Sequence, residues 1–196
     1  MKALLFMASL WLSTAPSIAW GNTGSVEAIW RRQVVSFEYR ADETTYSCRI
    51  LWQKISGMLL YVGARTAAPF EGFQCNDFAG TVRLQIALES PVEATPENLR
   101  AATDYDTRDL LVARLQGGQL PTAGDVARFP AAWTTLALRE SHMQLTSADC
   151  ELVQQLRRQV LPKLSVEVVQ EPARCVPTLS RGRAPALKVR ALLVAG

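Results

Sequence analysis

The chain has 196 residues, a formal net charge of +3 and 48% hydrophobic residues. This length suits one domain or two small intertwined ones, and the apolar content is sufficient for a buried core. The 21 basic residues are nearly balanced by 18 acidic ones. This balance argues against a protein that binds nucleic acid with its whole surface.

The amino-terminal segment, residues 1–21, has the pattern of a secretory signal peptide. A lysine beside the first methionine precedes an apolar run from Ala3 to Leu12, and Ser17 and Ala19 are the two small residues of a cleavage site. The run is shorter than the ~20 apolar residues of a membrane-spanning helix. We therefore expect a mature domain over residues 22–196, in the periplasm or secreted, with no transmembrane span.

Four cysteines follow the predicted cleavage site, namely Cys48, Cys75, Cys150 and Cys175. An even number of cysteines in an oxidising compartment indicates disulfide bonds. The alternative, a structural zinc site, needs closely spaced thiolate or imidazole ligands. The chain has no Cys-x-x-Cys pair and only one histidine, so we predict neither a metal site nor a redox pair.

The first half of the mature chain, about residues 30–90, predicts a strand, a helix and two further extended segments. Alternating apolar residues indicate the strands, and apolar residues at helical spacing indicate the helix. The first strand covers Val34 to Arg40, and the helix begins near Cys48 and ends before Gly63. The second extended segment runs from Tyr61 to Ala67. The last strand covers Val82 to Leu88 and ends at Pro91.

The second half, about residues 133–196, repeats this order. We expect a strand from Thr134 to Glu140, a helix that opens at Cys150 and stops at Pro162, an extended run at Val166 to Val168, and a strand from Leu187 to Val194. The apolar helix positions match at a constant offset of about 102 residues. The predicted fold is therefore α+β, with two tandem β-α-β-β repeats and helices packed on a largely antiparallel sheet.

The repeat selects one of the three pairings that four cysteines allow. Each half has a cysteine at the start of its helix and a second one in the loop that precedes its last strand. We expect Cys48 to pair with Cys75, and Cys150 to pair with Cys175.

A less regular connector, about residues 91–132, joins the two repeats within one domain. Thr95-Pro96-Glu97 has the pattern of a helix start, with a capping residue followed by proline. A second short helix is predicted from Thr107 to Gln116, closed by Gly117-Gly118. Residues 119–130 are expected to form a linker or an ordered surface loop.

Several short motifs are shared between this chain and a known group of proteins. They are Phe37-Glu38-Tyr39, Thr45-Tyr46-Ser47-Cys48, Val62-Gly63-Ala64, Asp149-Cys150-Glu151-Leu152-Val153, Leu161-Pro162 and Cys175-Val176-Pro177. With them the chain resembles a family of small exported proteobacterial proteins, over nearly the whole mature chain. The motifs are structural, and the family has no assigned activity. The resemblance implies export and paired cysteines, and it supplies no catalytic residue.

The search for catalytic chemistry finds no recognisable constellation. His142 is the only histidine, and its neighbour Ser141 would point to the opposite face of a strand. Asp104, Asp106 and Asp109 lack the glycine and the glutamate that an EF-hand calcium loop requires. We therefore predict no catalytic residue, no cofactor and no metal. Two carboxylates that cleave a glycoside would leave little trace in a sequence, so a hydrolase remains an alternative.

The carboxy-terminal segment is basic, because no acidic residue follows Pro172. Its basic residues are Arg174, Arg181, Arg183, Lys188 and Arg190. They are candidates for contact with an anionic partner such as a lipid headgroup, a cell-wall polymer or an acidic protein. The alternative is a solvated loop and the outer face of an edge strand, where charge prevents pairing between molecules.

These observations favour a non-catalytic binding or interaction protein of the periplasm. Its expected partner is another envelope protein or an anionic envelope polymer, and not a nucleic acid. The alternative is a hydrolase of cell-envelope material that uses carboxylates. Trp30 lies just before the first strand and is expected to pack on that strand, and Trp52, beside the helix stripe, is expected at the edge of the core.

Overall fold

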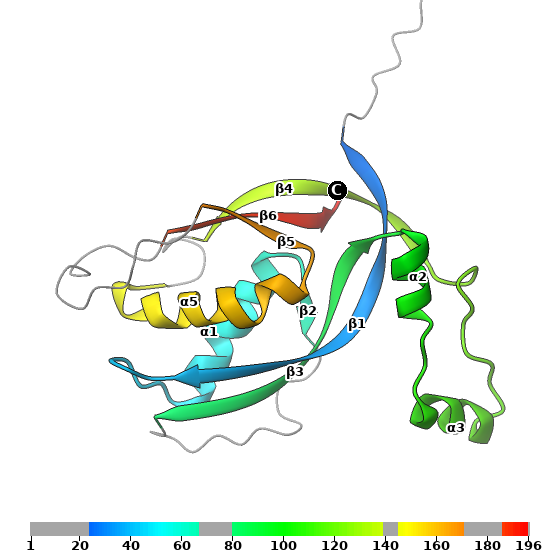
Figure 1. Cartoon of the computed structure of the whole chain (residues 1–196), viewed down its shortest axis with the longest axis horizontal. Coiled ribbons are helices and arrows are strands. Elements are labelled where there is room, and N and C mark those ends of the chain that lie inside the picture. The colour runs from blue at the N-terminus through cyan, green and yellow to red at the C-terminus, as the bar shows by residue number, and fades with distance from the viewer. Residues whose placement is uncertain (1–23, 67–79, 139–144, 171–185, 196) are drawn as a thin grey trace, which may run out of the picture.

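The structure is a computed structural model that describes residues 24–66, 80–138, 145–170 and 186–195. It confirms the predicted α+β class, with four α-helices and a six-stranded antiparallel sheet among these residues (Figure 1). None of the described helices is long and apolar enough to cross a membrane.

The elements follow the chain in the order β1 (Ser25–Arg40), α1 (Cys48–Tyr61), β2 (Arg65–Thr66), β3 (Thr81–Glu93), α2 (Pro96–Ala102), α3 (Thr107–Leu115), β4 (Arg128–Leu138), η1 (Ser147–Asp149), α5 (Cys150–Gln159), η2 (Leu161–Lys163), β5 (Val166–Gln170) and β6 (Leu187–Val194). The predicted starts of the two long helices at Cys48 and Cys150 are therefore confirmed. Gly63 follows α1 with a φ of 86°, a conformation that favours glycine.

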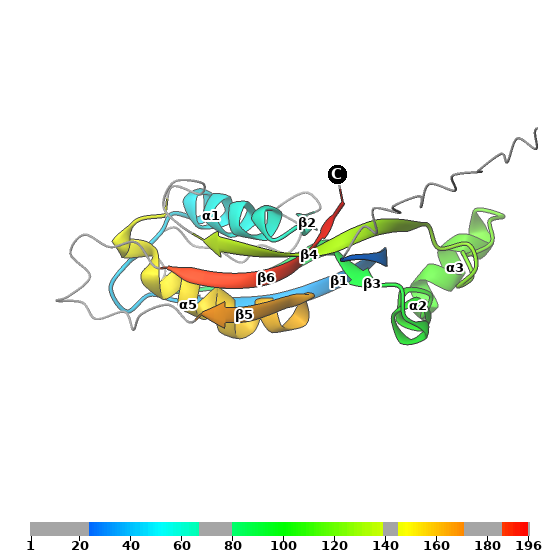
Figure 2. The ribbon, with the colours of Figure 1, turned by 90° about the horizontal axis from the view of Figure 1, so that it is seen from above.

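The sheet has the strand order β2-β3-β1-β4-β6-β5. In the first half β3 pairs with both β1 and β2, and in the second half β6 pairs with both β4 and β5. The halves meet where Ser25 to Ile29 of β1 pair with residues 128–132 of β4. From there β1 and β3 diverge from β4 and β6, and α1 and α5 lie between the two strand pairs in the view of Figure 1. Figure 2 shows the same elements from above.

One hydrophobic core fills the space between the diverging strands and the two helices. Phe37 of β1 lies in it together with Leu51 and Ile55 of α1 and Leu152 and Leu156 of α5. All five side chains are almost fully buried, and each such burial stabilises the fold by roughly 1.5–3 kcal/mol. Both helices therefore contribute to one shared core over the described residues.

Strand β1 begins earlier than the alternating pattern predicted, at Ser25. The alternation of buried and exposed residues is interrupted at Ala28 and Ile29. These neighbours point to opposite faces of the sheet, and both are fully buried because each face is covered there. Ala28 packs in a small cluster with Ala131, whereas Ile29 packs in another with Leu99 of α2. Similarly, β4 begins at Arg128, inside the segment that we expected to be the connector.

Pro91 lies inside β3, so the expectation that it ends the strand was wrong. The Ala94 N–H donates to the carbonyl oxygen of Glu27 in β1. Backbone groups of successive residues point to alternate sides of a strand. The backbone nitrogen of Pro91, three residues before Ala94, therefore points away from β1. Among the described strands, only β2 pairs with β3 on that side, at Leu88 and Glu89. Pro91 therefore removes no hydrogen bond from the β1–β3 ladder.

Near the end of β1, at Glu38 and Arg40, side chains of α5 cover the edge that faces away from β3. The Glu38 N–H donates to Gln159 Oε1 at 2.8 Å, and Gln159 Nε2 donates to the Glu38 carbonyl oxygen at 2.8 Å. Gln155 makes the same pair of bonds with Arg40, at 2.9 and 2.6 Å. Two side-chain amides, one helical turn apart, thus replace a neighbouring strand.

Candidate functional site

The described cysteines occupy equivalent positions at the first residues of α1 and α5. Neither Cys48 nor Cys150 is a free thiol, and no disulfide joins two cysteines of the described residues. Cys75 and Cys175 lie outside the described residues. The predicted pairing of Cys48 with Cys75, and of Cys150 with Cys175, therefore stays a prediction.

The basic carboxy-terminal residues are only partly described. Arg174, Arg181 and Arg183 lie outside the described residues, as does His142, whereas Lys188 and Arg190 are exposed on β6. Arg190 Nη1 lies 3.2 Å from Glu167 Oε2, and its guanidinium lies 4.9 Å from the ring centre of Trp133. The Arg190 charge therefore already has partners within the fold.

The two tryptophans singled out in the sequence take different positions. Trp52 is partly buried against the main core, as predicted. Trp30 lies within β1, where its ring centre is 5.1 Å from that of Phe129. The Arg65 guanidinium lies 3.8 Å over the Trp30 ring, so this aromatic pair holds an arginine at the surface.

Residues 94–127 form an arm that projects from one end of the sheet (Figure 1). Its first helix, α2, is anchored because Leu99 packs against Ile29 and Val92 of the sheet. Val126, near the end of the arm, packs against the same cluster, and polar contacts add to this anchoring. Tyr105 donates a hydrogen bond to the carbonyl oxygen of Pro121 at 2.8 Å, which ties the start of α3 to the returning chain.

Local signals define the two ends of α3, which has no buried residue. Asp106 caps the helix, because its Oδ1 accepts from the Asp109 N–H at 2.8 Å. Arg114 lies in the last turn, where a cation suits the helix dipole, and Gly117 follows with a φ of 66°. The helix contributes no buried residue to the fold.

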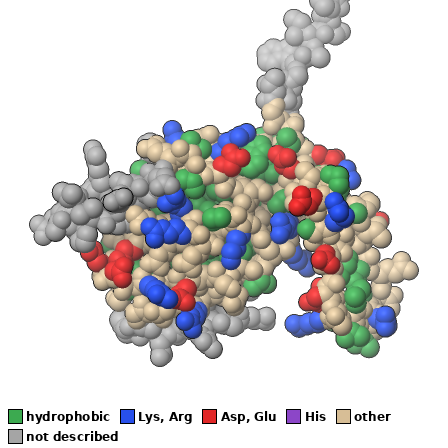
Figure 3. Space-filling view, in the orientation of Figure 1, with side chains coloured by type: hydrophobic (Ala, Val, Ile, Leu, Met, Phe, Trp, Pro, Cys, Tyr) green, Lys and Arg blue, Asp and Glu red, His purple; other side chains and the backbone are tan. Residues whose placement is uncertain are grey.

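The side chains of α3 leave a large apolar surface in water. Its exposed apolar residues are Leu110, Leu111, Val112 and Leu115, with exposed fractions between 41% and 86%. Figure 3 shows hydrophobic side chains gathered on this part of the arm. Since the core does not use these residues, they are a candidate interaction surface.

A cleft of about 710 Å³ separates the arm from the body of the protein, and a hollow between the two is visible in Figure 3. The body contributes residues of β1, β2 and β3 to it, and the arm contributes residues around the start of α3. Its charged lining residues are Arg32, Arg65, Glu89, Asp104, Asp106 and Asp109. Two arginines thus face four carboxylates.

The charges of the cleft are unequally paired. Arg32 Nε lies 2.7 Å from Glu89 Oε1, and the pKa of Arg32 is raised by the hydrogen bond and charge of Glu89 and, more weakly, by the charge of Asp109. The three aspartates of the arm make no ion pair within 4.0 Å with another described residue. The arm side of the cleft is therefore a surface of negative charge.

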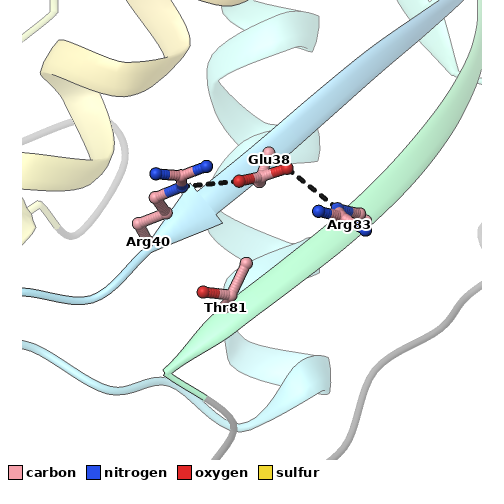
Figure 4. Close-up of a pocket in the computed structure, with 4 residues that line it drawn as sticks. All are labelled: Glu38, Arg40, Thr81 and Arg83. Carbon is pink, nitrogen blue, oxygen red and sulfur yellow. Dashed lines mark hydrogen bonds and ion pairs between the residues drawn. The ribbon is translucent and has the colours of Figure 1, made fainter.

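The outer face of β1 and β3 holds a second hollow, shown in Figure 4. Glu38 points between Arg40 and Arg83, and its carboxylate oxygens lie 2.5 Å from Arg40 Nε and 2.8 Å from Arg83 Nε. Hydrogen bonds from Arg83 and then Arg40 lower the pKa of Glu38. The carboxylate is ionised and already neutralised by its neighbours, so this hollow is an ion-pair network on an exposed sheet face.

A buried polar cluster joins the two halves. Asp149 is 1% exposed, and its carboxylate accepts from the Tyr46 hydroxyl at 2.6 Å, Lys54 Nζ at 2.9 Å and the Thr146 N–H at 2.6 Å. Burial raises the pKa of Tyr46, and the hydrogen bond to Asp149 adds to this effect. Among the described residues no buried side-chain polar atom lacks a hydrogen-bond partner, as expected of a cluster with a structural role.

The pKa is lowered in Glu38, Asp125 and Asp149. A general acid working near neutral pH needs a raised pKa. In the part of the chain that the structure describes, no group of three or more Asp, Glu, His or Cys residues is arranged to hold a metal ion.

The arm and its cleft were not identified from the sequence, although the helix was. One feature of the sequence did indicate that α3 is exposed. Leu110, Leu111 and Val112 are consecutive, so they cannot share the narrow apolar stripe of a helix that packs on one core. The cleft itself has no sequence signal, because its two walls come from residues 15 to 77 positions apart in the chain.

Comparisons with known proteins add no relative. No protein-family model, no curated protein and no solved structure matches this chain.

Proposed function

We propose that this chain is an exported, non-catalytic interaction protein that binds a partner polypeptide through α3 and the adjoining cleft. One observation carries the proposal. Four large apolar side chains are exposed on a nine-residue helix that contributes nothing to the core. Exposed apolar patches with a polar rim are typical of protein interaction sites.

The arrangement of the arm supports this role. Helix α2 is fixed to the sheet through Leu99, and Asp106 and Tyr105 hold α3 in shape. A partner therefore meets a preformed surface and loses little free energy in ordering it. The hydrolase alternative has less support, because the displaced carboxyl pKa values among the described residues all lie below their ordinary range.

The expected location and ancestry belong to the same proposal. The signal-peptide pattern and the resemblance to small exported proteobacterial proteins support export. The strand pairing is the same in the two halves. In the first half β3 pairs with β1 and β2, and in the second half β6 pairs with β4 and β5. This agreement supports an origin by duplication. The arm lies between the two units and has no counterpart in the topology of either, as expected of an insertion with a separate role.

Partner capture with matched variants tests the proposed function. The purified chain, Leu111→Ser/Leu115→Ser and the control Leu60→Ser are each immobilised and exposed to periplasmic extract. Leu60 is a suitable control because it is 59% exposed on α1, away from the arm. We expect proteins that are retained by the wild-type chain and the control and lost with the α3 variant. The same retained proteins on all three would contradict the proposal.

A further inference from the structure

We infer that the partner of α3 is a short, amphipathic and positively charged segment of another protein. This inference rests on the proposed function and adds the chemistry of the partner. Three properties of the arm support it, namely its size, the position of its carboxylates and the imbalance of charge in the cleft.

The size of the surface favours a short segment over a second copy of this chain. A stable protein–protein interface uses about 20–30 residues on each side. Helix α3 has nine residues, and Leu99 of the preceding α2 is already occupied by the sheet. A helix or extended segment that lies along α3 and enters the cleft fits this area, in the way that short amphipathic segments dock into grooves.

Asp109 borders the apolar surface of α3. Asp109 and Val112 are three residues apart, as are Val112 and Leu115, so each pair is adjacent on the helix surface. Leu111 is adjacent to Leu115, on the side farther from Asp109. Asp109 also lines the cleft. A partner that covers Val112 and Leu115 therefore brings its neighbouring side chains to Asp109.

The charge of the cleft selects a basic partner. The whole chain has a net charge of +3, yet the cleft has four carboxylates against two arginines. Arg32 is engaged by Glu89, and Arg65 is stacked on Trp30. Asp104, Asp106 and Asp109 have no such partner among the described residues. Lysine or arginine side chains of the bound segment would neutralise them, which favours both affinity and correct orientation.

Selection from a displayed library of short random peptides tests this chemistry without a known partner. The bait is the purified chain at low ionic strength. The selected peptides are then synthesised, and their affinities are measured for the wild type, for Leu111→Ser/Leu115→Ser, for Asp104→Asn/Asp109→Asn and for the control Leu60→Ser. Asp106 is left in place because it caps α3, and circular dichroism checks that each variant is folded.

We expect the selected peptides to combine leucine-like residues with lysine or arginine, and their binding to weaken as salt is added. The leucine variant and the aspartate variant should each lower the affinity by about tenfold or more, while the control keeps the wild-type affinity. Acidic or neutral peptides, or full affinity in Asp104→Asn/Asp109→Asn, would overturn the inference about charge. Loss of binding with the leucine variant alone would still support the proposed function.

Two further measurements separate other occupants from a basic segment. Analytical ultracentrifugation compares the wild type with Leu111→Ser/Leu115→Ser, and flotation with vesicles containing anionic phosphatidylglycerol compares the same two proteins. We expect a monomer and no vesicle binding for both. A wild-type dimer that the leucine substitutions dissociate, or vesicle binding that they abolish, would overturn the inference in favour of a second copy or a lipid surface.

Discussion

Asp149 shows how one residue can connect two distant parts of the sequence. Its carboxylate caps the turn before α5 by accepting from the Thr146 N–H, and it also accepts from Tyr46 and Lys54 of the first half. Burial alone would raise the pKa of Asp149, but the hydrogen bonds from these three groups outweigh it and the pKa is lowered. The charged form is therefore the one that stabilises the fold.

The substitution Asp149→Asn tests the importance of this charge. It removes the negative charge that accepts hydrogen bonds from Tyr46, Lys54 and Thr146, so we expect the free energy of unfolding at pH 7 to fall by about 1.5–3 kcal/mol. The folded state binds fewer protons at Asp149 than the unfolded chain does, because its pKa is below the ordinary 3.8. The wild type therefore loses this stabilisation as the pH falls through the pKa of Asp149 in the folded state. The difference in the free energy of unfolding between the wild type and Asp149→Asn then becomes smaller.

Urea unfolding of both proteins at pH 7 and at about pH 3.5 measures this effect. Asp125→Asn is the control, because Asp125 is an aspartate whose pKa is lowered by hydrogen bonds from Thr122 at an exposed turn. It should change stability much less than Asp149→Asn. An equal difference between wild type and Asp149→Asn at both pH values would show that the charge is not the cause.

At the scale of elements, helix α5 serves as a cover for a strand edge as well as a layer of the core. Leu152 and Leu156 enter the core, while Gln155 and Gln159 bond the backbone of β1. The edge is open because β4 pairs with β1 only as far as Ile29. An open edge is a template for pairing with other chains, and a covering helix prevents this.

Replacement of Gln159 by alanine should expose this edge locally. Its hydrogen bonds to Glu38 are partly buried, so we expect a loss of about 1–3 kcal/mol and faster hydrogen exchange at the Glu38 amide. Gln155→Ala should cost less, because the bonds to Arg40 are exposed. The amides of Phe37 and Tyr39 point toward β3 and are internal controls. Unchanged exchange at Glu38 would show that Gln159 does not hold this N–H.

Helix α3 differs from α5 because none of its residues is buried in the fold. Its existence follows from local rules, since Asp106 caps it and Gly117 follows its end. Its exposure does not follow from these capping residues, because they determine where the helix begins and ends and not what it packs against. Only the position of the arm, which α2 attaches to the end of the sheet, leaves these residues in water.

At the scale of the whole molecule, two strand pairs diverge around one shared core. The described residues of each half could not enclose that core alone, since α5 covers the edge of β1 and Tyr46 reaches Asp149. The halves are therefore interdependent in stability even if they arose by duplication. Covalent bonds within each half would strengthen the two units before they pack together.

Peptide mapping under non-reducing conditions tests the predicted disulfides. We expect peptides that link Cys48 to Cys75 and Cys150 to Cys175, each of which would disappear on reduction. In the chain-entropy model each bond stabilises the fold by roughly 3–4 kcal/mol, so reduction should lower the denaturation midpoint clearly. A peptide that links Cys48 to Cys150 would contradict both the pairing and its basis in the repeat.

The sequence by itself determined the local structure of this protein. Periodicity located the core strands and both long helices, and capping residues located α2 and α3, because these features depend on neighbours within a few positions. Only the tertiary structure decided where β1 begins, why Pro91 is tolerated, how Gln159 replaces a strand and which helix remains exposed. Each of these depends on contacts between residues far apart in the chain, and the candidate site exists only where α3 and the sheet leave a charged cleft between them.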